Sequence, residues 1–556
     1  MKNQETRIER NRNKGLVASA LTSTIGIFIS KFLGIAYVIP FNRIIGDYDI
    51  SFYSYAYTIY DYLLTLSVAG IPLAISMVVS KYFVKEDYST ILLIKKVGRN
   101  LLLATGICAA LLLILTTPML AELFSPTGAD AQYLKNVRIV MYIISFALAI
   151  VPVLSFYRGY YQGQREFGFT ATSEIIQQIS RVTFLLISVI ACVYFFNQPK
   201  TVAVYWAVGS TVFAAIICLI YVLRFDSINK KEMADLAIKQ VKTSYSKKLI
   251  LKELIMVGMP FLLTSLLGNA NGILNMIFFN NAMSLRGESI GYTTSVFSMI
   301  NFSTFKITSI PQVVAIGFGA AIIPLLSAAR VADNYSLIKK QVNQTLITAS
   351  YIALPLVFCI FVFATPIYAV FYGYSNYILG GSVLEWASLI GLTYSIFGIG
   401  SSMILALSLR KEYIKGLIIW LLVKLTTTYL IVYLIGYPGA FITTAIADSL
   451  LFISNLYHIK KVYGVSYRKY YNYLIKIVMA LLLMLLTVLL LRFIGFNFNY
   501  NNQLMDLLYL IIYGVIVMSI YLLVTYRMNL PQEIFNLDLN VLKVKIREIT
   551  NRIIKK

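Results

Sequence analysis

Four basic residues are embedded in long apolar runs of the sequence, namely Lys31, Arg181, Lys306 and Lys424. A charge at the centre of a membrane helix costs roughly 2.5–3.5 kcal/mol on insertion scales, so it normally faces a polar cavity, an ion pair or a ligand. No acidic residue lies within a helical turn of Lys31 or Lys306 along the chain. We therefore predict that these two lysines bind an anionic group of a substrate.

Arg181 and Lys424 have acidic residues available and are interpreted differently. Glu174 precedes Arg181 by about two helical turns, which places both on one helix face. Asp448 and Glu385 are the candidate partners of Lys424. We expect ion pairs inside the helical bundle for both cations, with a coupling-ion site as the alternative.

Three further polar residues are candidates in apolar runs. Asn269 and Asn275 either line a substrate cavity or accompany the close helix packing that the small residues of Gly268–Gly272 permit. Asp61 is a candidate partner or coupling site, although it is also close enough to a helix end to be solvated.

Prolines interrupt the first two predicted spans of each half of the chain. Proline removes a backbone hydrogen bond and permits a bend, which a gate could use. Helix kinks with no role in transport are the alternative. The candidate gating residues are Pro40, Pro72, Pro311 and Pro324.

The composition indicates the elements that must position these residues. Of 556 residues 59% are hydrophobic and 13% are charged, a balance typical of polytopic helical membrane proteins rather than soluble domains. We predict an all-α protein with about 14 transmembrane helices. The apolar runs lie near 16–40, 52–79, 100–120, 139–157, 172–196, 203–223, 254–280, 294–327, 343–371, 384–408, 416–435, 438–458, 474–494 and 505–526.

The net charge of +24 is distributed unevenly. Most lysines and arginines outside the apolar runs fall in alternate connectors, including both ends of the chain. The positive-inside rule therefore predicts a multi-pass protein of the cell membrane with both termini in the cytoplasm. We expect the basic connectors to contact anionic lipids rather than nucleic acid.

A weak internal repeat predicts the domain organisation. Residues 69–81 and 318–330 each contain a glycine, an internal proline and a closing cation, and they are six predicted helices apart. Such repeats are typical of transporters whose substrate lies between two pseudo-symmetric six-helix lobes. The predicted parts are an N-terminal lobe (1–223), a basic cytoplasmic connector (224–253), a C-terminal lobe (254–460), a pair of C-terminal helices (461–526) and a basic cytoplasmic tail (527–556).

The sequence contains no recognisable motif for catalysis or metal binding. There is no Walker motif, no HExxH and no nucleophile elbow, and the four cysteines lie in apolar runs without CxxC spacing. We predict that the protein is not an enzyme and has no catalytic residues, cofactor or metal site. Any transport must then use a coupling ion, the membrane potential or the substrate gradient.

Two stretches of the sequence resemble a known family. Ser30-Lys-Phe-Leu-Gly34 resembles the first-helix signature of MurJ-type lipid II flippases. Arg158-Gly-Tyr-Tyr-Gln-Gly163 and the following 173–181 resemble the polysaccharide-exporter signature. The number of spans also fits MurJ and its Gram-positive relatives, rather than the multidrug (MATE) transporters of the same MOP superfamily, which have fewer.

The resemblance implies a flippase that moves the peptidoglycan precursor lipid II, an undecaprenyl-diphosphate-linked disaccharide-pentapeptide, to the outer leaflet by alternating access. It implies that Lys31 and Lys306 hold the diphosphate and that the last two helices form a groove for the prenyl tail. This chain departs from the family pattern at Tyr37 and around Leu64, where further cations are expected. The predicted cavity is therefore less basic than that of better-known members.

Three alternatives remain open from the sequence. The nearest is an exporter of another undecaprenyl-linked glycan, of capsular or teichoic type. A cation-coupled drug antiporter would need acidic residues in the N-terminal lobe. A non-transporting membrane scaffold would not need the embedded cations. If the protein is a flippase, the cell-wall synthesis machinery is a candidate partner.

Overall fold

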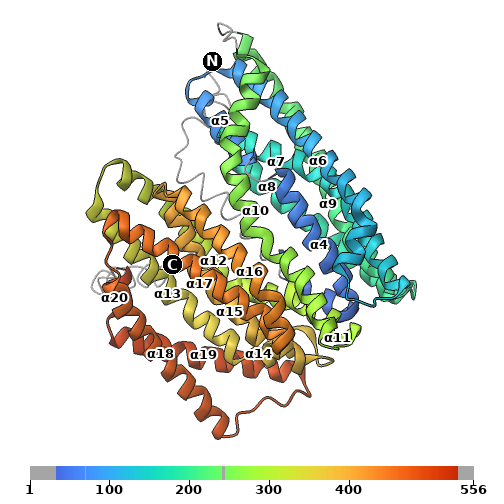
Figure 1. Cartoon of the computed structure of the whole chain (residues 1–556), viewed down its shortest axis with the longest axis vertical. Helices are drawn as coiled ribbons and strands as arrows, with labels where there is room; N and C mark the ends of the chain where they lie inside the picture. Colours follow the sequence, from blue (N-terminus) through green and yellow to red (C-terminus); the bar gives the residue numbers. More distant parts are fainter. Residues whose placement is uncertain (1–32, 35, 69–70, 239, 241–244, 536–556) are drawn as a thin grey trace, which may run out of the picture. The chain divides into compact units, whose positions relative to one another are not determined.

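The computed structural model describes residues 33–535, apart from 35, 69–70, 239 and 241–244. Within this part every regular element is a helix, as Figure 1 shows. The predicted all-α class is therefore confirmed. The predicted positions in 1–32 and 536–556 lie outside the described residues.

The chain divides into two compact units, which we describe separately. The first comprises residues 1–303 and 432–436, and the second comprises 304–431 and 437–556. Each unit is a group of residues that contact one another more than they contact the other unit. The boundary between them lies inside the helical run Ile290–Val331. The two-lobe organisation inferred from the repeat stays a prediction.

The first unit is formed by long helices joined by short turns. They are α3 (Val38–Ile45), α4 (Asp47–Val68), α5 (Ile71–Val84), α6 (Tyr88–Phe124), α7 (Ala131–Gly163), α8 (Phe167–Ile190) with the π-helical turn η1 (Ala191–Phe195), α9 (Lys200–Ile238), α10 (Lys247–Leu285), α11 (Ile290–Ser298) and the π-helical turn η2 (Met299–Ser303). Helix α7 packs against α4, α5, α6 and α9 and so forms much of the core.

The second unit continues directly from η2. Its helices are α12 (Thr304–Val331), α13 (Tyr335–Val362), α14 (Ala364–Tyr372), α15 (Tyr377–Ala406), α16 (Arg410–Ile435, whose last residues belong to the first unit), α17 (Pro438–Tyr463), α18 (Arg468–Phe493), α19 (Gln503–Arg527) and α20 (Leu530–Phe535). Helix α15 packs against α12, α13, α14 and α17 and is the centre of this unit.

Ten helices of the described part are long and apolar enough to cross a membrane. They coincide with the predicted runs on α6, α7, α8, α9, α13 and α15 to α19. The predicted runs at 52–79, 254–280 and 294–327 lie on α4 and α5, on α10, and on α11 and α12. The protein is thus a multi-pass membrane protein, whereas most of the run 16–40 is outside the described residues.

Polar residues begin many of these helices. The first turn of a helix has backbone N–H groups without an acceptor in the helix, and a side-chain oxygen at the N-cap satisfies one of them. Asp87 accepts from the backbone N–H of Thr90 at 3.0 Å, and Asp130 accepts from that of Tyr133 at 2.6 Å. Ser246, Ser289 and Asn334 cap α10, α11 and α13 in the same way.

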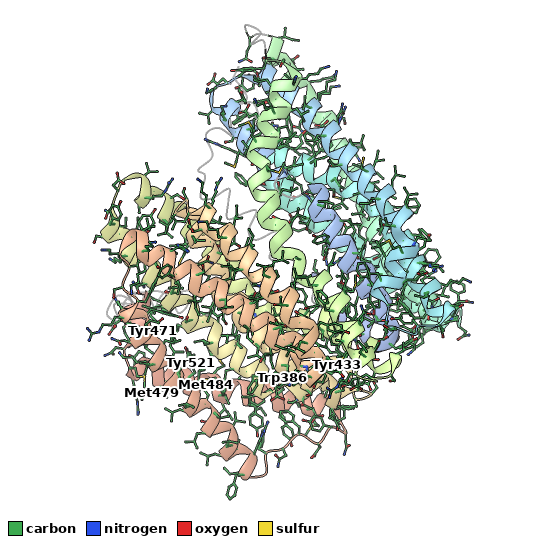
Figure 2. All side chains as sticks on the ribbon, viewed as in Figure 1. Trp386, Tyr433, Tyr471, Met479, Met484 and Tyr521 are labelled. Carbon is green, nitrogen blue, oxygen red and sulfur yellow. The ribbon has the colours of Figure 1, made fainter. Side chains whose placement is uncertain are left out.

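The C-terminal helix pair α18 and α19 packs against α13 within the second unit. Tyr521 on α19 donates a hydrogen bond to the backbone carbonyl of Tyr351 on α13 at 2.8 Å. On α18 the side chain of Met484 is buried, whereas that of Met479 is exposed (Figure 2). The pair therefore has apolar residues on its outer face as well as in the core, as expected for helices that contact lipid.

Candidate functional site

The structure describes two of the four predicted substrate-binding side chains. Lys306 lies on α12, three residues after η2, and its side chain is partly buried. Asn275 lies on α10 and is buried. Asn269 also lies on α10, but its side chain is outside what the structure describes, and Lys31 lies outside the described residues altogether.

The π-helical turn η2 ends three residues before Lys306 in the chain and forms hydrogen bonds within the first unit. Asn42 on α3 donates to Ser303 Oγ at 2.8 Å and to Asp47 Oδ1 at 3.1 Å. Ser298 Oγ donates to the backbone carbonyl of Asp47 at 2.6 Å. π-helical turns are rare in proteins, and those that occur often lie at functional sites. No sequence signal that we used indicates this turn.

Arg181 on α8 lies in an aromatic environment in the first unit. Its guanidinium lies 5.4 Å from the ring centroid of Tyr37, which precedes α3. Tyr53 and Tyr57 on α4 are within electrostatic range of the same guanidinium and stack on each other at 4.3 Å. No carboxylate of the described residues lies within ion-pair distance of Arg181.

The acidic candidates of the first unit lie near this aromatic cluster. Asp61 on α4 has an exposed side chain and acts electrostatically on Tyr37 and Tyr60. Glu174 lies on α8, is partly buried and acts on Cys218 of α9. Their predicted roles as ion-pair partners or coupling sites stay predictions.

Lys424 lies in a buried polar cluster of the second unit that joins three helices. The Lys424 side chain is fully buried, and its Nζ donates to Thr444 Oγ1 at 2.7 Å. Asp448, one turn further along α17, accepts from Trp420 Nε1 at 2.7 Å and from Thr393 Oγ1 at 3.0 Å. The ammonium and the carboxylate are within electrostatic range of each other. Sequence reasoning named both charged residues but not the hydroxyl and indole groups around them.

The other acidic candidate for Lys424 is placed differently. Glu385 lies on α15 and its side chain is exposed, whereas the Lys424 side chain is fully buried. Of the two acids that the sequence offered, Asp448 is the one that shares the buried cluster.

The four candidate gating prolines lie in three helices. Pro40 lies in α3, Pro72 is the second residue of α5, and Pro311 and Pro324 lie in α12. Pro311 is buried and lies in van der Waals reach of Gly391 on α15. Gating by these residues remains a prediction.

The Arg158–Gly163 motif has a structural explanation. A Cβ atom added at Gly159 would lie 2.3 Å from the backbone oxygen of Pro72, and one added at Gly163 would lie 2.7 Å from that of Ser76. The two glycines are four residues apart on α7, so they form a smooth strip against which α5 packs. Arg158 donates through Nε to Ser173 Oγ at 2.9 Å and through Nη2 to Gln177 Oε1 at 2.7 Å, which joins α7 to α8.

The structure describes contacts of the charged group for two of the embedded cations. Arg181 lies against the Tyr37 ring and Lys424 donates to Thr444 Oγ1, and the described residues contain no cluster of His, Cys, Asp and Glu that could hold a metal ion. A cation in a low-dielectric environment attracts a phosphate or another anion more strongly than it does in water.

A sequence profile of the family described as "Polysaccharide biosynthesis protein" matches residues 16–330, more than half of the chain. The chain belongs to this family. The match includes the first-helix motif, the Arg158–Gly163 motif and Lys306.

One relative and one solved structure are each similar to this chain over nearly its whole length. It is 28% identical to "Lipid II flippase MurJ" of Bacillus subtilis (strain 168) over 532 residues, which is 93% of this chain and 96% of the relative. Its fold is similar to a solved structure titled "Lipid II flippase MurJ, inward closed conformation", with a TM-score of 0.64, 15% identity and coverage of 90% of this chain and 99% of the other.

A MATE transporter has the same fold at a similar level. The inward-facing conformation of a multidrug resistance MATE family transporter of the MOP superfamily gives a TM-score of 0.62, with 16% identity and coverage of 80% of this chain and 98% of the other. The predicted resemblance to MurJ-type proteins is confirmed. At these identities the solved structures establish the fold alone.

Proposed function

We propose that this protein is a flippase that carries lipid II, an undecaprenyl-diphosphate-linked peptidoglycan precursor, from the inner to the outer leaflet. The observation that carries the proposal is the similarity to a lipid II flippase over 93% of this chain and 96% of that relative. The cations embedded in apolar helices also support a transporter of an anionic lipid, because such charges normally mark a substrate path. The described residues contain no cluster that could hold a metal ion.

In this proposal Lys306 contacts the diphosphate, together with Lys31. Lysine binds phosphate as a point charge, and the attraction must stay moderate so that the substrate can be released. The π-helical turn that precedes Lys306 gives α12 a point at which its helical register can change. Alternating access would use such a change, with the membrane-embedded prolines as further bending points.

Orientation and energy source belong to the same proposal. Both termini lie in the cytoplasm, and the basic connectors contact anionic lipids of the inner leaflet. Transport draws on a coupling ion or on the membrane potential. The buried Lys424–Asp448 cluster and Asp61 are the candidate coupling sites.

The family description favours one second candidate. Export of another undecaprenyl-linked glycan would use the same diphosphate contacts, and the profile that matches residues 16–330 is named for polysaccharide biosynthesis. The drug antiporter shares only the fold with this chain.

Depletion followed by lipid extraction separates the two candidates. If the protein flips lipid II, its loss causes lipid II to accumulate in cells and peptidoglycan synthesis to stop. An unchanged lipid II pool together with loss of a surface polymer would reject the proposal and favour the second candidate.

A further inference from the structure

The aromatic cluster around Arg181 contains two buried hydrogen-bond donors without an acceptor. Arg181 Nε and Gln178 Nε2 are both buried, and neither has a hydrogen-bond partner in the part of the chain that the structure describes. Buried polar atoms are nearly always satisfied, and an exception points to a water, an ion or a ligand. A donor beside a guanidinium favours an anion, because charge-assisted hydrogen bonds are the stronger ones.

The two donors lie on one face of α8, and this face lies against Gly34 and Tyr37, which precede α3. Gln178 and Arg181 are three residues apart on α8 and therefore share a face. A Cβ atom added at Gly34 would lie 3.2 Å from Gln178 Nε2, and Tyr37, three residues after Gly34, lies against Arg181. The absence of a side chain at Gly34 thus lets the Gln178 amide approach the backbone there, and the tyrosine ring lies against the guanidinium.

The charges around Arg181 do not neutralise it by direct contact. No carboxylate among the described residues is within ion-pair distance of the guanidinium, and its neighbours Tyr53 and Tyr57 are neutral phenols. Tyr57 accepts a hydrogen bond from the guanidinium, which leaves Arg181 Nε as the unpartnered donor. Asp61 acts on the same group of tyrosines from α4. Its negative charge would weaken the binding of an anion without occupying either donor.

We infer that Arg181 and Gln178 form an anion-binding site in the first unit that accepts a phosphate-type group. This inference deepens the proposed function, on which its lipid ligand rests: Arg181 would hold the diphosphate of the carrier lipid from α8. The first helix carries Tyr37 where the MurJ-type pattern expects a cation, and Arg181 places its charge against that tyrosine. A free inorganic anion has the same chemistry and is the alternative source of the ligand.

Binding to the purified full-length protein tests the site, with undecaprenyl diphosphate, inorganic pyrophosphate and chloride as separate probes. Arg181→Gln is expected to weaken binding of undecaprenyl diphosphate by about tenfold or more, because it removes the charge-assisted bonds. Arg181→Lys should give an intermediate affinity, since it keeps the charge but loses the planar fork. Arg224→Gln is the matched control, because Arg224 is an exposed arginine on α9.

A second variant keeps the test independent of misfolding. Gln178→Glu places a carboxylate beside the guanidinium, and we expect it to raise the melting temperature of the ligand-free protein while it lowers anion affinity. A merely structural role for Arg181 would leave anion affinity unchanged in Gln178→Glu. That result would overturn the inference.

The remaining outcomes separate the site from the proposed function. Lipid binding that is equal in the wild type and in Arg181→Gln overturns the site and leaves the proposed function standing. Arg181-dependent binding of pyrophosphate or chloride without lipid binding supports an anion site and counts against the flippase. No response to any probe means that water alone satisfies the two donors, which overturns the inference.

Discussion

Lys424→Met is expected to be strongly destabilising, because it removes the cation from a buried cluster that contains a carboxylate. Asp448 lies with 8% of its surface exposed and keeps only the neutral donors Trp420 and Thr393 in this variant. Breaking one partner of a buried charged pair typically costs about 3–5 kcal/mol, since the remaining charge is left uncompensated. We expect a loss of this size unless the carboxyl group becomes protonated.

The double variant Lys424→Met/Asp448→Asn should lose less stability than Lys424→Met alone. Replacing both members of a buried pair leaves no charge to compensate, and such replacements are often close to neutral. The two changes should therefore be strongly non-additive, as expected for side chains in one network. Lys415→Met on the same helix is the control, because the Lys415 side chain is 69% exposed and its pair with Glu412 is solvated.

Thermal unfolding of the purified proteins, with transport by each variant, tests this reasoning. Additive losses in the double variant would refute the electrostatic coupling of Lys424 and Asp448. Transport by a stable double variant would identify the pair as structural. A stable double variant without transport would instead favour the coupling role that the sequence left open.

Three further outcomes are expected. Lys306→Ala should abolish complementation of a depleted strain while the protein is still expressed, and the exposed Lys340→Ala should not; growth on Lys306→Ala alone would reject the role of this lysine. Gly159→Ala should lower the melting temperature, because its Cβ would lie 2.3 Å from a backbone oxygen of α5, whereas Gly168→Ala has open space; equal melting of the two would contradict the packing argument. A cysteine at Asn376 should react with an impermeant thiol reagent from outside cells, and one in the long basic connector should not; the reverse pattern would invert the topology.

The helices were predictable because a membrane span requires a long apolar run, and such runs are visible in the sequence. The burial of Lys424 and Asp448 in one cluster could also be predicted, since a lone charge in an apolar run requires a partner. The hydroxyl and indole partners of these two residues could not be predicted, because Thr393 and Trp420 resemble ordinary membrane-helix residues in the sequence. Contacts between helices depend on rotation about each axis, which composition does not specify.

Two features near the candidate site had no usable sequence signal. The π-helical turn η2 adds a residue to one helical turn without any characteristic residue type, and its last residue, Ser303, accepts a hydrogen bond from Asn42 that the sequence does not indicate. Arg181 was expected to pair with Glu174, which shares its helix face. That pairing stays a prediction, and the structure adds a neighbour that the sequence did not indicate, the Tyr37 ring beside the guanidinium.

The most direct measurement of the central claim is lipid II translocation by the purified protein in proteoliposomes. Labelled lipid II is placed in both leaflets, and its exposure to an impermeant reagent is followed over time. The wild type should expose the inner pool much faster than protein-free vesicles do, and Lys306→Ala should not. Rates equal to those of empty vesicles, from wild-type protein shown to be folded, would contradict the account.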